Sequence, residues 1–221
     1  MVETHGFMGA VNNVLEWISR LALLNILWIF FTFLGLIVLG FYPATVAMFS
    51  VVRKWAMGDF EASVTKVFWN SYKKEFKKSN LLGGVISSVG LVVFIDFLFL
   101  RQASPEVQSF LFVPFLLILI LFICTLFYVF PMYVHYEMSI RDVLKNSFVV
   151  MVMRPLSTLM ILVCGIGFMI LLSFAPPLLI ICSGNVFALM MMKPAMNAFE
   201  HVNRKYEKAM AKELEKQNLL S

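Results

Sequence analysis

The chain has 221 residues, of which 61% are hydrophobic and only 14% are charged, and it contains 23 phenylalanines. These proportions exclude a soluble globular domain and indicate a polytopic membrane protein. The net charge of +5 is explained by basic loops beside anionic lipid. We therefore expect membrane lipids as partners and no nucleic acid.

Continuously apolar runs predict an all-α bundle. A helix needs about 20 apolar residues to cross a hydrocarbon core about 30 Å thick, and the strands of a β-barrel would instead alternate polar and apolar residues. We expect one membrane domain over 1–221, with transmembrane helices at about 21–39, 81–100, 110–130, 156–175 and 177–192.

The first span contains one polar residue, Asn25. Transmembrane bundles often use such groups for hydrogen bonds between helices. Asn25 therefore has two interpretations, a helix–helix contact or a ligand. The frequent use of such polar groups in helix packing favours the contact.

Segment 43–80 follows the Tyr42-Pro43 pair, where we expect the chain to turn, and is strongly basic. It carries Arg53, Lys54, Lys66, Lys73, Lys74, Lys77 and Lys78. Because basic residues in short loops stay on the cytoplasmic side, we expect this segment to be a cytoplasmic elbow. Its apolar residues recur at helical spacing after Gly58-Asp59, which predicts an amphipathic helix with Asp59 as its N-cap.

The second span opens with two overlapping small-residue pairs, Gly83 with Ser87 and Gly84 with Ser88. Such pairs let another helix approach closely, either within the chain or in a partner. Asp96 is a carboxylate inside the same span. It can be read as a functional intramembrane group or as an interfacial side chain near Arg101.

The second cytoplasmic elbow is expected at 132–155, where Ser139 and Asp142 have capping-box spacing. Lys193-Pro194 is expected to end a short and irregular fifth span, followed by an amphipathic tail helix at 195–217. This arrangement leaves only Arg20 and Arg101 outside among the lysines and arginines. It predicts an external N-terminus and a cytoplasmic C-terminus.

The sequence offers no catalytic, cofactor-binding or metal site that we can name. The histidines at 5, 135 and 201 have no second histidine or cysteine at ligand spacing, and no phosphate-binding glycine loop is present. We therefore expect no enzyme activity and no cofactor.

Three stretches resemble the YesL-like family of Gram-positive bacterial membrane proteins, with similarity over about 7–203. They are Phe41-Tyr42-Pro43-Ala44-Thr45-Val46-Ala47, Val51-Val52-Arg53-Lys54-Trp55 and Phe76-Lys77-Lys78-Ser79-Asn80-Leu81-Leu82-Gly83. The family is a domain of unknown function whose members are encoded beside carbohydrate uptake systems. The resemblance implies a multi-pass protein of the bacterial cell membrane, with the permease subunits of an ABC importer as partners.

We therefore predict a non-enzymatic accessory or regulatory subunit of a carbohydrate ABC importer. Its candidate partner or packing surface consists of Tyr42, Pro43, Arg53, Lys54, Phe68, Trp69, Phe76, Lys77, Lys78, Asn80, Gly83, Gly84, Ser87 and Ser88. Two alternatives stay open. The first is a small transporter or channel that uses Asp96, and the second is a membrane sensor that uses the basic segments.

Overall fold

The computed structural model describes residues 7–174 and 178–220, and these ranges form seven helices. They are α1 (Phe7–Leu34), α2 (Val38–Ala56), α3 (Val64–Gln102), α4 (Pro105–His135), α5 (Ile140–Met153), α6 (Pro155–Phe174) and α7 (Leu178–Leu220). Within the described part of the chain, α1, α3, α4 and α6 are long and apolar enough to cross a membrane. The predicted polytopic helical membrane protein is confirmed.

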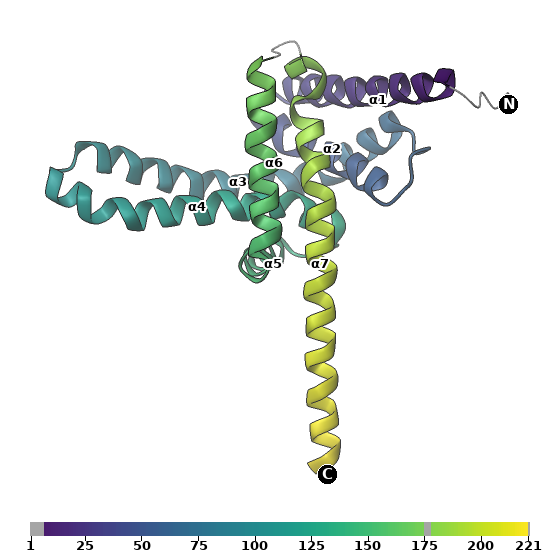
Figure 1. Cartoon of the computed structure of the whole chain (residues 1–221). Helices are drawn as coiled ribbons and strands as arrows, with labels where there is room; N and C mark the ends of the chain where they lie inside the picture. Colours follow the sequence, from purple (N-terminus) through teal and green to yellow (C-terminus); the bar gives the residue numbers. More distant parts are fainter. Residues whose placement is uncertain (1–6, 175–177, 221) are drawn as a thin grey trace.

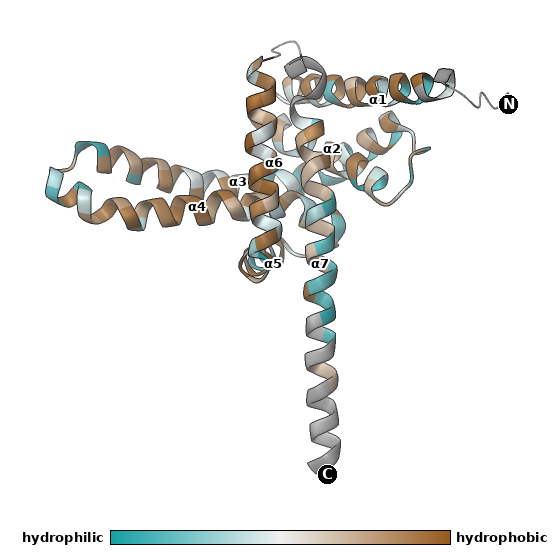
Figure 2. Ribbon diagram, in the orientation of Figure 1, coloured by the Kyte–Doolittle hydropathy of each residue, from teal (hydrophilic) through white to brown (hydrophobic). Residues whose placement is uncertain are grey.

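The α2 helix is the centre of the fold, and it packs against α1, α3, α4 and α7. Most of its residues are buried, including Trp55 and the run from Pro43 to Phe49. The helices around it are long, and Figure 1 shows that α3 and α4 project from the centre as a hairpin, whereas α6 and α7 run across them. Figure 2 shows that the projecting hairpin and α6 are largely hydrophobic.

The chain turns at Gly35–Ile37, where α1 gives way to α2, and not at Tyr42-Pro43 as the sequence predicted. The prediction was wrong because Pro43 lies inside α2. A proline inside a helix removes the hydrogen bond to the carbonyl four residues earlier. That carbonyl belongs to Leu39, and it accepts a hydrogen bond of 3.0 Å from the side-chain amide of Asn80 instead. A side chain of α3 thus replaces the lost backbone bond.

The two helices of the α1–α2 hairpin are antiparallel, so the start of α1 lies beside the end of α2. Trp17 packs edge-on against Trp55 and Phe60, with ring centroids 5.5 and 5.3 Å apart, and Arg20 donates a hydrogen bond to the Phe60 carbonyl. The prediction that Arg20 lies across the membrane from the first elbow is therefore wrong. The contact removes the reason for placing the N-terminus outside.

The helix predicted within the first elbow and the second predicted span form one continuous helix, α3. It begins at Val64, after Ser63, and not at Asp59, which lies in the preceding turn and pairs with Lys54 at 3.2 Å. Beyond Gln102, the chain turns back into α4, which extends past Pro131 to His135. The first elbow is thus built mainly from helices that continue into the predicted spans, whereas the second consists mainly of the separate helix α5.

The N-cap predicted from the capping-box spacing is confirmed, because Ser139 accepts a hydrogen bond of 3.2 Å from the backbone amide of Asp142 at the start of α5. The expected break at Lys193-Pro194 is wrong, since α7 runs through Pro194 without interruption. Gly184 and Asn185 are also helical, which contradicts the expected irregular backbone. Residues 175–177, where the fourth predicted span ends and the fifth begins, lie outside the described residues, so that boundary stays a prediction.

Packing explains why α7 continues. Its buried residues recur at three- and four-residue spacing on both sides of Pro194, and they are Ala188, Met191, Met192, Ala195, Ala198, Phe199 and Val202. One apolar face therefore contacts the core over the whole stretch. Burial along this face outweighs the loss of one backbone hydrogen bond.

Candidate functional site

Several residues of the predicted partner surface lie inside the molecule, between α2 and α3. Pro43, Phe68 and Gly83 are buried, and a Cβ atom at Gly83 would overlap the ring of Tyr42. The Tyr42 hydroxyl lies 2.6 Å from that of Ser87. The small pair of Gly83 and Ser87 therefore serves packing within the chain.

Three further residues of the predicted surface also have partners in the chain. Asn80 bonds to the Leu39 carbonyl, and the half-buried ring of Phe76 packs edge-on against Tyr72. Lys54 is exposed and pairs with Asp59, whereas Arg53 is half-buried. These contacts hold the α2–α3 unit and the turn that precedes α3.

Four of the remaining residues of the predicted surface, Trp69, Lys77, Gly84 and Ser88, point outward. We define the outer stripe of α3 as the exposed residues that follow one another at three- or four-residue spacing: Lys66, Trp69, Lys73, Lys77, Leu81, Gly84 and Ser88. Such spacing places them on one side of the helix. No other part of the described chain comes within 4 Å of a Cβ atom built at Gly84. The second small pair thus faces away from the molecule.

The beginning of this stripe combines an aromatic ring with positive charge. The ammonium group of Lys73 lies 4.7 Å from the centre of the Trp69 ring, at a distance typical of cation–π contacts. The Trp69 ring is 42% exposed, and its inner side packs on Phe31 and Tyr72. The ring is therefore held between core aromatic residues and the Lys73 ammonium group, with part of its surface exposed.

The two predicted intramembrane polar residues have different surroundings. Asn25 is completely buried in α1, as a packing role requires. Asp96 is exposed on the α3–α4 hairpin, and among the described residues it forms no ion pair with Arg101, which instead lies over the Phe97 ring. The alternative that uses Asp96 for transport stays a prediction.

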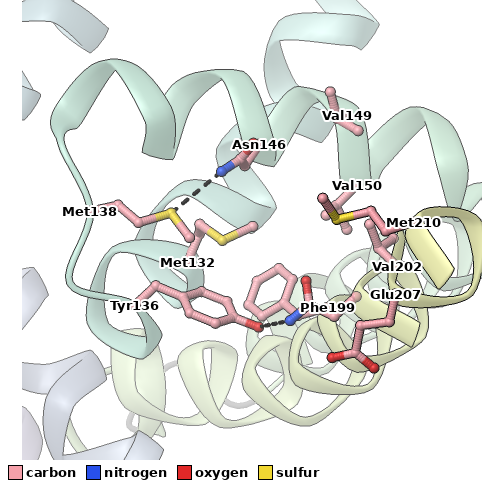
Figure 3. Close-up of a pocket in the computed structure, with 11 residues that line it drawn as sticks. Met132, Tyr136, Met138, Asn146, Val149, Val150, Phe199, Val202, Glu207 and Met210 are labelled. Carbon is pink, nitrogen blue, oxygen red and sulfur yellow. Dashed lines mark hydrogen bonds between the residues drawn. The ribbon is translucent and has the colours of Figure 1, made fainter. Parts of the chain in front are cut away.

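A pocket of about 310 Å³ lies between the end of α4, α5 and α7. Figure 3 shows methionine, valine and phenylalanine side chains around it, together with the polar groups of Asn146, Tyr136 and Glu207. Asn203 donates to the Tyr136 hydroxyl at 2.9 Å, and Asn146 donates to the Met138 sulfur at 3.4 Å. Flexible methionine side chains adapt to varied shapes. The pocket suits an apolar group of modest size.

On the other side of Tyr136 is a second and more polar cavity, of about 520 Å³, which we call the basic pocket. It lies between α2, the first half of α3 and the end of α4, and it is lined by Ser50, Arg53, Asn70, Ser71, Lys74, Glu75, Lys78, Tyr133, His135, Tyr136 and Glu137, together with two valines. The sequence indicated Arg53 and Lys78 as candidate residues, but it did not predict that they line the same cavity. Among the described residues, no group of three or more acidic, histidine or cysteine side chains could hold a metal ion.

Comparison with known proteins identifies the family of this chain. Over 211 residues, it is 36% identical to the uncharacterized protein YesL of Bacillus subtilis (strain 168), and the match covers 96% of the chain and all of YesL. Residues 21–97 match the protein family of unknown function DUF624. The chain belongs to the DUF624, or YesL-like, family. The predicted resemblance is therefore confirmed.

Two further relatives of this DUF624 protein come from the same organism. The uncharacterized protein YteU is 40% identical over 79% of the chain and 78% of its own length, and the uncharacterized protein YesV is 35% identical over 88% and 93%. No solved structure matches the chain. The part matched by the family contains α2, the second half of α1 and most of α3, and thus both the α2–α3 interface and the outer stripe.

Proposed function

We propose that this DUF624 protein is a non-enzymatic accessory or regulatory subunit that binds the permease subunits of a carbohydrate ABC importer through the outer stripe of α3. The outer stripe is the observation that carries the proposal. The association with carbohydrate uptake comes from the resemblance to a family whose members are encoded beside carbohydrate uptake systems. The C-terminus is assigned to the cytoplasm because α7 and the elbows carry most of the basic residues.

The stripe offers two kinds of contact along one helix. Its first part presents Trp69 and three lysines, and tryptophan is enriched among the residues that dominate binding energy at protein interfaces. Its second part presents Gly84 and Ser88 within an apolar sequence, where small side chains allow a second transmembrane helix to pack closely. A single partner with a membrane helix and a cytoplasmic segment would use both parts.

Two substitutions separate binding from folding. Trp69→Ala removes the exposed ring, and Gly84→Leu adds bulk where the chain itself leaves open space. We expect each to reduce the amount of permease that co-purifies with the tagged protein from its native host by roughly 10-fold, the loss typical of a dominant interface residue. Quantitative mass spectrometry of the detergent-solubilised complex measures the effect.

Gly167→Leu is the matched control, because Gly167 is exposed on α6 and no other part of the described chain comes within 4 Å of a Cβ atom built there either. It should leave the yield of permease unchanged. If the wild-type protein repeatedly emerges without importer subunits from cells that express the importer, the proposed function is wrong. If permease binds equally to all three variants, the assignment of the stripe is wrong.

A further inference from the structure

The basic pocket gathers basic side chains from three separate segments of the chain. Arg53 comes from α2, Lys74 and Lys78 come from α3, and His135 is the last residue of α4. Helix packing therefore places side chains that are up to 82 positions apart in sequence around one cavity. Charged groups of one sign repel each other, so their convergence needs a compensating group.

Part of the compensation comes from two carboxylates. Glu75 accepts a hydrogen bond of 2.6 Å from the Tyr133 hydroxyl and lies 3.9 Å from the Lys74 ammonium group. Glu137 lies 3.8 Å from the same ammonium group, but its side chain is 97% exposed. Both carboxylates are thus closest to Lys74. Lys78 instead donates to the Met138 carbonyl at 2.9 Å, a neutral acceptor that leaves its charge in place.

Two buried polar atoms in the pocket lack a partner. They are Nε of Arg53 and Nδ1 of His135, and neither forms a hydrogen bond within the described part of the chain. The Nε–H group of Arg53 is a charged donor, and a buried donor without an acceptor costs about 1–3 kcal/mol, and more when it is charged. The Arg53 guanidinium also forms no ion pair with any described residue, whereas its neighbour Lys54 does. An acceptor that enters the pocket would relieve this cost.

We infer that the basic pocket binds the phosphate group of a phosphate ester. A phosphate offers several strong acceptor oxygens and more than one negative charge, and arginine binds it through two parallel hydrogen bonds. In this pocket Arg53 and His135 hold the oxygens from the buried side, and Lys78 contributes charge at the opening. The hydroxyls of Ser50 and Ser71 lie 2.8 Å apart and line the same cavity.

The size of the cavity indicates that the phosphate is part of a larger molecule. A cavity of about 520 Å³ falls within the range of pockets that bind whole small ligands. A phosphate ester of this size can come from the headgroup of an anionic phospholipid or from a soluble sugar phosphate. Both sources share the chemistry that the pocket recognises.

Calorimetric titration of the purified full chain in an uncharged detergent tests the inference. The two probes are short-chain phosphatidylglycerol and glucose 6-phosphate, with glucose as the control that lacks phosphate. We expect saturable binding of at least one phosphate probe and none of glucose. Binding of the lipid alone identifies a headgroup site, and binding of the sugar phosphate alone identifies a soluble ligand.

Arg53→Gln and Lys78→Gln should each weaken that binding by roughly 10-fold or more, the loss expected when a charge-assisted hydrogen bond is removed. Lys77→Gln is the matched control, because Lys77 belongs to the outer stripe and does not line the pocket. Circular dichroism and gel filtration check that the variants fold. If Arg53→Gln does not fold, the affinity of Lys78→Gln decides the outcome, because Lys78 is exposed. Equal affinity in all variants, or no saturable binding of either phosphate probe, would overturn the inference.

Discussion

Phe68→Ala should lower the free energy of unfolding by about 3–5 kcal/mol, the range measured for large aromatic side chains removed from a core. Phe68 has no exposed surface. Its ring packs 5.4 Å from that of Phe31 in α1 and stacks on Tyr72 at 6.4 Å. Its removal leaves a cavity where α1 and α3 meet. Thermal unfolding in detergent, followed by circular dichroism, measures the loss.

Trp69→Ala provides the comparison from the next position. Its ring is partly exposed, so its removal should cost much less stability than that of Phe68, even though tryptophan is the larger residue. The two variants should therefore behave in opposite ways, one affecting folding and the other affecting permease binding. Equal destabilisation by both would contradict the assignment of Trp69 to the outer surface.

Gly83→Ala should destabilise the protein by about 1–3 kcal/mol, the usual cost of forcing extra atoms into a packed core. The added Cβ atom would overlap the Tyr42 ring near its attachment to the backbone. The ring must then move, and its hydrogen bond with Ser87 is lost. The midpoint of thermal unfolding and the yield of monodisperse protein both report the effect.

Gly84→Ala is the matched control for this experiment. No other part of the described chain comes within 4 Å of a Cβ atom built at Gly84, and alanine favours a helix more than glycine does. The variant should be as stable as the wild type or slightly more stable. If it unfolds as easily as Gly83→Ala, the distinction between an inner and an outer small pair on α3 is wrong.

The sequence predicted the class of fold well and the connections between helices poorly. Long apolar runs indicate membrane helices because few other structures tolerate such composition. Turns are harder to predict from prolines. A proline can remain inside a helix when one other group donates a hydrogen bond to the carbonyl that the proline leaves unpaired. The donor for Leu39 comes from Asn80, 41 positions away, so the position of the first turn depends on a tertiary contact.

The candidate surface could be predicted only in part for a similar reason. Adjacent residues such as Phe68 and Trp69, or Gly83 and Gly84, have the same chemical character, and composition cannot tell which one faces inward. Helical spacing could have helped, since Trp69, Lys73 and Lys77 recur in step with Gly84 and Ser88. The basic pocket required the fold, because α2, α3 and α4 meet there from distant parts of the chain.

The length of α3 has a consequence for how the protein meets its membrane. At a rise of 1.5 Å per residue, its 39 residues extend for about 58 Å, nearly twice the thickness of a hydrocarbon core. A rod of this length, if it stands upright, emerges well into the aqueous phase. A change in its tilt would then move the two ends of the outer stripe in opposite directions, so bilayer thickness would alter how a docked neighbour is held.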